Sequence, residues 1–109
     1  MRPLIGLTPN RDRLENNEVL RINRDYMDSV LRSGGIPVLL PLTDDRELLR
    51  DLADELDGLI VTGGADIDPY VYGEENLYSE EIDPVRDRME LTLVRLFSKN
   101  RKPLQRRLR

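Results

Sequence analysis

The sequence predicts an α/β fold in which helices flank a partial, open, parallel sheet. Three short apolar runs, at residues 4–8, 36–40 and 59–62, each precede a segment in which apolar residues recur at helical spacing. Continuous apolar runs are typical of parallel strands that helices cover on both faces. Strand and helix units in this order are joined into one sheet by right-handed crossovers. The 109 residues leave room for a single domain.

The first unit begins with a strand at residues 4–8, which Pro9 ends in a turn. Residues 10–19 are polar and without period, so no element is predicted there. Apolar side chains then recur at helical spacing over residues 22–31. The glycine pair at 34–35 is a stop signal for this helix.

The second unit begins with the strand at residues 36–40, which its unbroken apolar run predicts to be interior. Thr43 is expected to cap the next helix, with Asp44 and Asp45 in the first turn, where the helix dipole favours negative charge. The apolar stripe of this helix spans residues 48–56.

The third strand, residues 59–62, is followed by two glycines and then by a loop over residues 65–82. This loop is longer than most connections in a compact domain, and long loops of this kind are often functional. Asp83 and Pro84 are typical of the start of a helix, which is expected to end near Asn100. Because ligands of open α/β sheets bind at the carboxyl ends of the strands, that edge is the expected site.

The composition excludes several classes of function. Seventeen Lys and Arg against 21 Asp and Glu give a net charge of -4, which argues against a nucleic-acid partner. The chain has no Cys and no His, so it has no thiolate nucleophile, no imidazole base and no such ligand for a metal. The N-terminal apolar stretch is too short for a signal sequence or a membrane span. A cytoplasmic protein without cofactor or membrane partner is expected.

Four segments carry a family resemblance: RPLIGLT at 2–8, GGIPVLLP at 34–41, LDGLIVTGGADIDPYVYGE at 56–74 and DPVRDRMELTLVR at 83–95. Together they resemble the class I glutamine amidotransferase-like hydrolases, in particular the γ-glutamyl-γ-aminobutyrate hydrolase group. The resemblance implies a flavodoxin-like fold. Residues 1–104 would be the N-terminal part of such a domain. Residues 105–109 would be a basic tail outside the family pattern. From their charge alone, residues 101–109 are expected to be disordered, the alternative being an arm that binds nucleic acid.

The resemblance also implies an activity, the hydrolysis of γ-glutamyl amides by a cysteine with a later histidine and carboxylate. In the family this cysteine lies in a sequence like KPVLGICRG. Residues 102–104 match its beginning, and residues 105–109 then differ. No catalytic residue is therefore expected in this chain, which we interpret as cut before its nucleophile and inactive alone. The alternatives are a non-catalytic binding or interaction module and one half of a split enzyme.

By resemblance, Gly63 and Gly64 contribute a backbone N–H to an oxyanion hole; the alternative is that they only form a turn. Asp66, Asp68 and Tyr72 are candidate substrate-loop residues. The two aspartates could instead order the loop, and no third ligand is spaced to complete a cation site with them. Packing of the loop against the sheet is the alternative role of the tyrosine. No metal site is predicted.

Arg86, Asp87 and Glu90 match a family RDxxE pattern. They are expected either on a solvated or salt-bridged helix face or, alternatively, in contact with substrate. A sheet that stops after residue 104 would also leave an interior strand as an edge. Exposed strand edges pair with other chains, so self-association or a complementary chain is expected.

Overall fold

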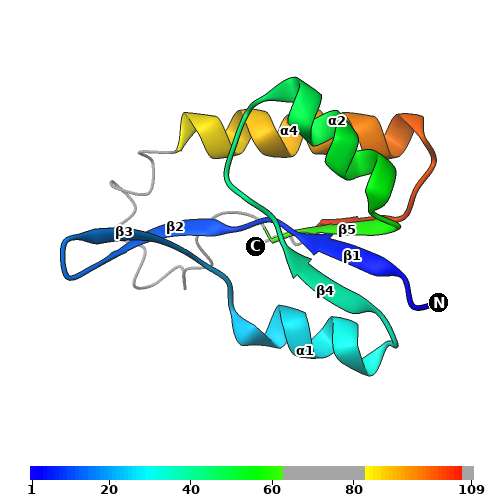
Figure 1. Cartoon of the computed structure of the whole chain (residues 1–109), viewed down its shortest axis with the longest axis horizontal. Coiled ribbons are helices and arrows are strands. Elements are labelled where there is room, and N and C mark those ends of the chain that lie inside the picture. The colour runs from blue at the N-terminus through cyan, green and yellow to red at the C-terminus, as the bar shows by residue number, and fades with distance from the viewer. Residues whose placement is uncertain (63–82, 107–109) are drawn as a thin grey trace.

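The computed structural model describes residues 1–62 and 83–106 and has the predicted α/β architecture (Figure 1). The strands of its main sheet are β1 (Leu4–Leu7), β4 (Ile36–Leu39), β5 (Gly58–Val61) and β6 (Leu104–Arg106). All are parallel, in the order β4-β1-β5-β6. Helices α2 (Arg46–Glu55) and α4 (Pro84–Lys99) cover one face, and α1 (Arg24–Arg32) lies on the other (Figure 1). No helix in the described residues is long and apolar enough to span a bilayer.

The hydrophobic core lies between the sheet and the layer formed by α2 and α4. The strands contribute apolar side chains from one side and the two helices from the other. Leu93 and Phe97, four residues apart on α4, are fully buried. The buried members are Leu40, Leu49, Ala53, Leu56, Leu59, Val61, Met89, Leu93 and Phe97. Burial of each large apolar side chain contributes roughly 1.5–3 kcal/mol, so this layer is the main source of stability.

Local signals correctly predict where α1 ends and where α4 begins, but they predict the wrong capping residue for α2. Helix α1 ends before Gly34, whose φ of +92° suits glycine, and α4 begins after Asp83 with proline in its first turn. Helix α2 is capped by Asp45, not Thr43: the Asp45 carboxylate accepts the N–H groups of Glu47 and Leu48. The Thr43 hydroxyl instead accepts the Asp45 N–H at 3.1 Å.

The prediction that the second strand is interior is wrong. Strand β4 lies at one edge of the described sheet and its residues are only partly buried or exposed. Pro37 is consistent with an edge position for β4, because proline has no N–H to donate to a neighbouring strand and is found mainly in edge strands. The continuous apolar run reflects contact with helices on both faces, and it does not distinguish an edge from a central position.

Residues 10–19, where no element is predicted, lie in a β-hairpin that extends away from the main sheet (Figure 1). Strands β2 (Asn10–Leu14) and β3 (Asn17–Arg21) are antiparallel, and Glu15 and Asn16 between them have positive φ, as a type I′ turn requires. The usual signal for such a turn is a glycine, which this one lacks.

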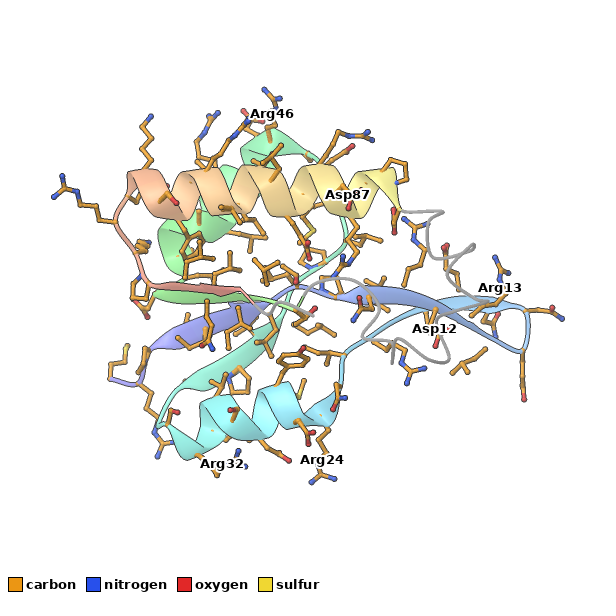
Figure 2. The ribbon with its side chains drawn as sticks, turned by 180° about the vertical axis from the view of Figure 1, so that it is seen from behind. Asp12, Arg13, Arg24, Arg32, Arg46 and Asp87 are labelled. Carbon is orange, nitrogen blue, oxygen red and sulfur yellow. The ribbon has the colours of Figure 1, made fainter. Side chains whose placement is uncertain are left out.

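Charged pairs hold the hairpin together and tie it to α4. Arg11 contacts Glu18 across the hairpin and Asp83 at the start of α4, each at 2.8 Å. Asp12, labelled in Figure 2, pairs with Arg21. The Arg13 backbone N–H and the Arg21 guanidinium hold the pKa of the Asp12 carboxyl below its ordinary value.

The C-terminal tail is a second difference from the sequence prediction. Leu104, Gln105 and Arg106 form β6 and pair with Leu59, Ile60 and Val61 of β5. The prediction of disorder is therefore wrong for residues 101–106, while residues 107–109 lie outside the described part. An edge strand tolerates polar residues because its stability comes largely from backbone hydrogen bonds on one side.

Lys102 fixes the start of β6 to the C-terminus of α2. Its ammonium group donates to the carbonyl oxygens of Ala53, Asp54 and Leu56, at 2.6, 3.0 and 2.9 Å. Helix α2 has no basic residue in its own last turn. Lys102 thus supplies hydrogen bonds to carbonyl groups at the C-terminus of α2 that lack partners within the helix. Its positive charge also interacts favourably with the negative end of the helix dipole.

Candidate functional site

The carboxyl ends of β1 and β5 are joined by two threonines, Thr8 and Thr62. The Thr62 N–H donates to the Thr8 hydroxyl at 3.0 Å, and the Thr62 hydroxyl donates to the Thr8 carbonyl at 3.0 Å. Both residues are buried, with exposed fractions of 0% and 1%. We call this pair the threonine clamp. It continues the β1–β5 ladder beyond the last strand residues by way of side chains.

Tyr26 of α1, which lies on the face of the sheet opposite α2 and α4, also contacts Thr62. Its hydroxyl donates to the Thr62 carbonyl at 3.4 Å. The N–H, hydroxyl and carbonyl of Thr62 are thus all engaged, and its backbone is held where the chain leaves the sheet. The residue that follows it is Gly63, the first of the predicted site residues.

A buried ion pair lies beside the threonine clamp, under the end of β1. Arg86 of α4 donates from Nε to the Pro9 carbonyl at 2.9 Å, and its Nη2 is 2.9 Å from Glu90 Oε2. Only 6% of Arg86 is exposed, so the expectation of a salt bridge is confirmed but that of a solvated face is wrong for this residue. Asp87, between them in sequence, is exposed on the outside of α4 (Figure 2). The structure therefore brings Arg86 and Glu90 together and leaves Asp87 apart.

The other predicted site residues cannot be placed. Gly63, Gly64, Asp66, Asp68 and Tyr72 all fall within residues 63–82, outside the described part of the chain. In residues 1–62 and 83–106, no three carboxylates lie close enough to hold a metal ion. The described part of the site is thus the end of the sheet at Thr62 and the start of α4 at Asp83, the two residues that flank residues 63–82 in the sequence.

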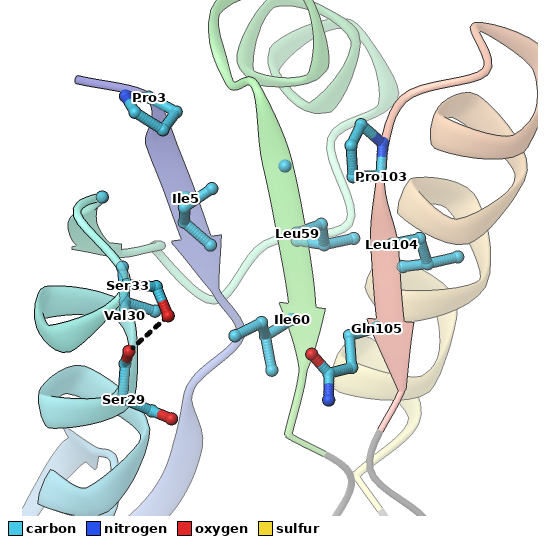
Figure 3. A pocket seen from close by; sticks show the side chains of 12 residues that line it. Pro3, Ile5, Ser29, Val30, Ser33, Leu59, Ile60, Pro103, Leu104 and Gln105 are labelled. Atoms are coloured by element: carbon cyan, nitrogen blue, oxygen red, sulfur yellow. Dashed lines mark hydrogen bonds between the residues drawn. The ribbon is translucent and has the colours of Figure 1, made fainter.

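A hollow that the sequence does not predict lies on the α1 side of the sheet (Figure 3). Its volume is about 330 Å³, and Ile5, Ile60, Leu104 and Gln105 contribute to its lining. A second hollow of about 300 Å³ shares Ile60 and Gln105 with it. Helix α1 packs mainly on β4, and no other described helix covers β5 and β6 on this face. We call this region the open face.

The sequence holds a weak signal for the threonine clamp. Thr8 and Thr62 are each the last residue of an apolar run, and a hydroxyl at the carboxyl end of a parallel strand can bond to the neighbouring strand. The signal for Arg86 is weaker still, because nothing local distinguishes a buried arginine from an exposed one on a helix. Both interactions join residues more than 50 positions apart.

Comparison with known proteins supports the family resemblance found in the sequence. Residues 3–105 match the family described as peptidase C26. The chain is 30% identical over 104 residues to a γ-glutamyl-γ-aminobutyrate hydrolase of Escherichia coli O157:H7, covering 94% of this chain and 41% of that protein. It is 34% identical over 89 residues to a glutamine amidotransferase-like protein of Lactococcus lactis, covering 81% of this chain and 37% of that protein. The chain thus spans about two fifths of the length of these relatives.

The threonine clamp should stabilise the protein measurably. Thr8→Val keeps the shape of the side chain but leaves the buried Thr62 N–H without its acceptor, so we expect a loss of about 1–3 kcal/mol in the free energy of unfolding. Denaturant unfolding measures this loss. Thr92→Val, at a partly buried position of α4 whose hydroxyl makes no hydrogen bond to the described residues, is the matched control and should change stability by less than about 0.5 kcal/mol. Equal losses in the two variants would contradict the assignment.

Proposed function

The chain belongs to the peptidase C26 family, and we propose that its sheet forms the N-terminal part of a site that hydrolyses γ-glutamyl amide bonds. The observation that carries the proposal is the threonine clamp, which holds the chain in place directly before Gly63 and Gly64. Relatives named as γ-glutamyl-γ-aminobutyrate hydrolases support the reaction class.

Amide hydrolysis needs hydrogen-bond donors aimed at the oxygen that becomes negative in the tetrahedral intermediate. One such donor typically contributes about 10²–10³ in rate. In our proposal Gly64 supplies a backbone N–H and Gly63 the turn that presents it. Because Thr62 is fixed through its N–H, hydroxyl and carbonyl, the peptide that follows it starts from a defined position. A donor held in this way needs little reorganisation during the reaction.

The nucleophile and its base must come from outside these 109 residues, which contain neither Cys nor His. We propose that a cysteine, a histidine and an orienting carboxylate are supplied by a further segment or a separate chain that completes the sheet next to β6. Asp66, Asp68 and Tyr72 would then contact the γ-glutamyl substrate. The reaction proposed needs only water besides the protein, and we place it in the cytoplasm.

We expect the 109 residues alone to release no glutamate from a γ-glutamyl amide. Loss of a nucleophile or base from such a site typically lowers the rate by several orders of magnitude. Hydrolysis of γ-glutamyl-γ-aminobutyrate measures this, with the Escherichia coli relative as the positive control. Activity that follows the chain through purification would contradict the proposal.

A chimera tests the role of the glycine pair. Residues 1–104 joined to the remaining part of the Escherichia coli relative should hydrolyse γ-glutamyl-γ-aminobutyrate. Gly64→Pro, which removes the N–H, should then lower kcat by about 10²–10³. Gly64→Ala keeps the N–H and should lose less, which separates the donor from the added side chain. A folded chimera that is inactive, or one indifferent to Gly64→Pro, would contradict the proposal.

The open face and the outer edge of β6, with which no other described strand pairs, support a partner chain, either a second copy or a complementary half. Apolar side chains such as Ile5 and Ile60 are only partly covered there, and an unpaired strand edge templates pairing. We therefore expect light scattering to find a dimer or larger species of the isolated chain, and a hydrophobic dye to bind to it.

Two substitutions locate the association. Ile60→Lys on the open face should shift the chain towards monomer, because a charge there cannot be buried without a partner. Leu91→Lys, on the exposed side of α4, is the control and should leave the association unchanged. An isolated chain that is monomeric, unfolds cooperatively and binds no dye would show that the described layers suffice on their own.

A further inference from the structure

A cationic hollow lies on the outer surface of the protein, between α2 and α4. Its volume is about 170 Å³, and it is lined by Arg46 and Arg50 from α2 and by Thr92, Arg95 and Leu96 from α4. Figure 2 shows Arg46 on the outer side of the helical layer, away from the sheet. The hollow is therefore separate from the carboxyl edge of the strands and from the open face.

Three of the five residues that line this hollow are arginines. Arg46 and Arg50 are four residues apart on one helix, as are Arg95 and Lys99 on the other. Like charges at this spacing destabilise a helix. Here the two helices also present their arginines to the same hollow, in a chain whose net charge is -4. Glu47 and Asp54 stand three residues before and four residues after Arg50 on the same helix, but in the described residues neither is ion-paired with an arginine of the hollow, so these guanidinium groups are available to an anion.

The carboxylates near the start of α2 do not supply a counter-charge either. Asp44 is bonded to Arg88, at 2.8 and 2.9 Å, and the Asp45 carboxylate accepts the Glu47 and Leu48 N–H groups. In the described residues, Arg46, Arg50 and Arg95 make no ion pair. Because Asp45 already caps the helix, an anion in the hollow would be held by side chains and not by free backbone N–H groups.

We propose that this hollow binds an oxyanion of the phosphate type. A guanidinium group presents parallel N–H donors that match two phosphate oxygens, and several of them around one hollow favour a dianion over a monoanion. The Thr92 hydroxyl adds a neutral donor at the side of the site. The ligand is either free phosphate or the phosphoryl group of a small metabolite, since the hollow has room for one such group but not for an extended chain.

Titration of the 109-residue chain with inorganic phosphate, pyrophosphate and glycerol 3-phosphate, at constant ionic strength, tests the proposal. Calorimetry should give saturable binding at one site, whereas succinate should bind at least about tenfold more weakly. Tighter binding of glycerol 3-phosphate than of phosphate assigns the site to a metabolite, and equal or weaker binding assigns it to the free anion. Absence of saturation into the millimolar range for all three probes would overturn the proposal.

Three variants test the location of the site. Arg50→Gln and Arg95→Gln each remove a charged donor and should weaken binding about tenfold or more. Arg24→Gln, an exposed arginine of α1 on the opposite layer, carries the same change of charge and should leave the affinity within about twofold. Arg50 is exposed, so its variant should melt no lower than the unsubstituted chain. Equal weakening by all three variants would indicate general charge attraction and would overturn the site.

Discussion

The two hydrogen bonds that Thr62 donates to Thr8 are the constraint on which the rest of the site depends. Parallel strands end where their backbone ladder ends, and beyond that point a chain normally diverges from its neighbour. Here the two hydroxyls extend the pairing of β1 and β5 by one more step in a buried setting. An unsatisfied buried N–H costs about 1–3 kcal/mol, so alternatives that break the clamp are disfavoured. The position of Thr62, the last described residue before residue 63, is therefore set by the sheet.

Two other polar contacts hold the helices in place against this sheet. Arg86 fastens the start of α4 to the end of β1 through the Pro9 carbonyl, and Lys102 fastens the start of β6 to the end of α2. Each is a charged group that bonds to backbone carbonyls, so each joins segments that are distant in sequence. The layer of α2 and α4 is thereby fixed at both ends of the sheet, whereas the part of the opposite layer that the structure describes consists of α1 alone.

The parts of this structure that could be predicted are those with local causes. Apolar runs located β1, β4 and β5, and the cap at Asp83 and the glycine at 34 set helix ends, because these signals act within a few residues. The hairpin could not be predicted, because its turn uses Glu15 and Asn16 without a glycine. The place of β4 at the edge depended on which strands pair, and the burial of Arg86 depended on packing across the fold. Of the candidate site, the sequence indicated the edge of the sheet but not the contacts between Thr8, Thr62, Tyr26 and Arg86.

Hydrogen exchange at the Thr62 amide tests the central claim most directly, because that N–H is protected only if the Thr8 hydroxyl accepts it. Protection should match that of the Leu59 amide, which bonds to the Pro103 carbonyl within the sheet. The same amide should exchange much faster in Thr8→Val, while Leu59 changes less. Exchange of Thr62 in the unsubstituted chain as fast as that of Asn16 in the exposed hairpin turn would contradict the account, since β1 and β5 would then separate before the glycine pair.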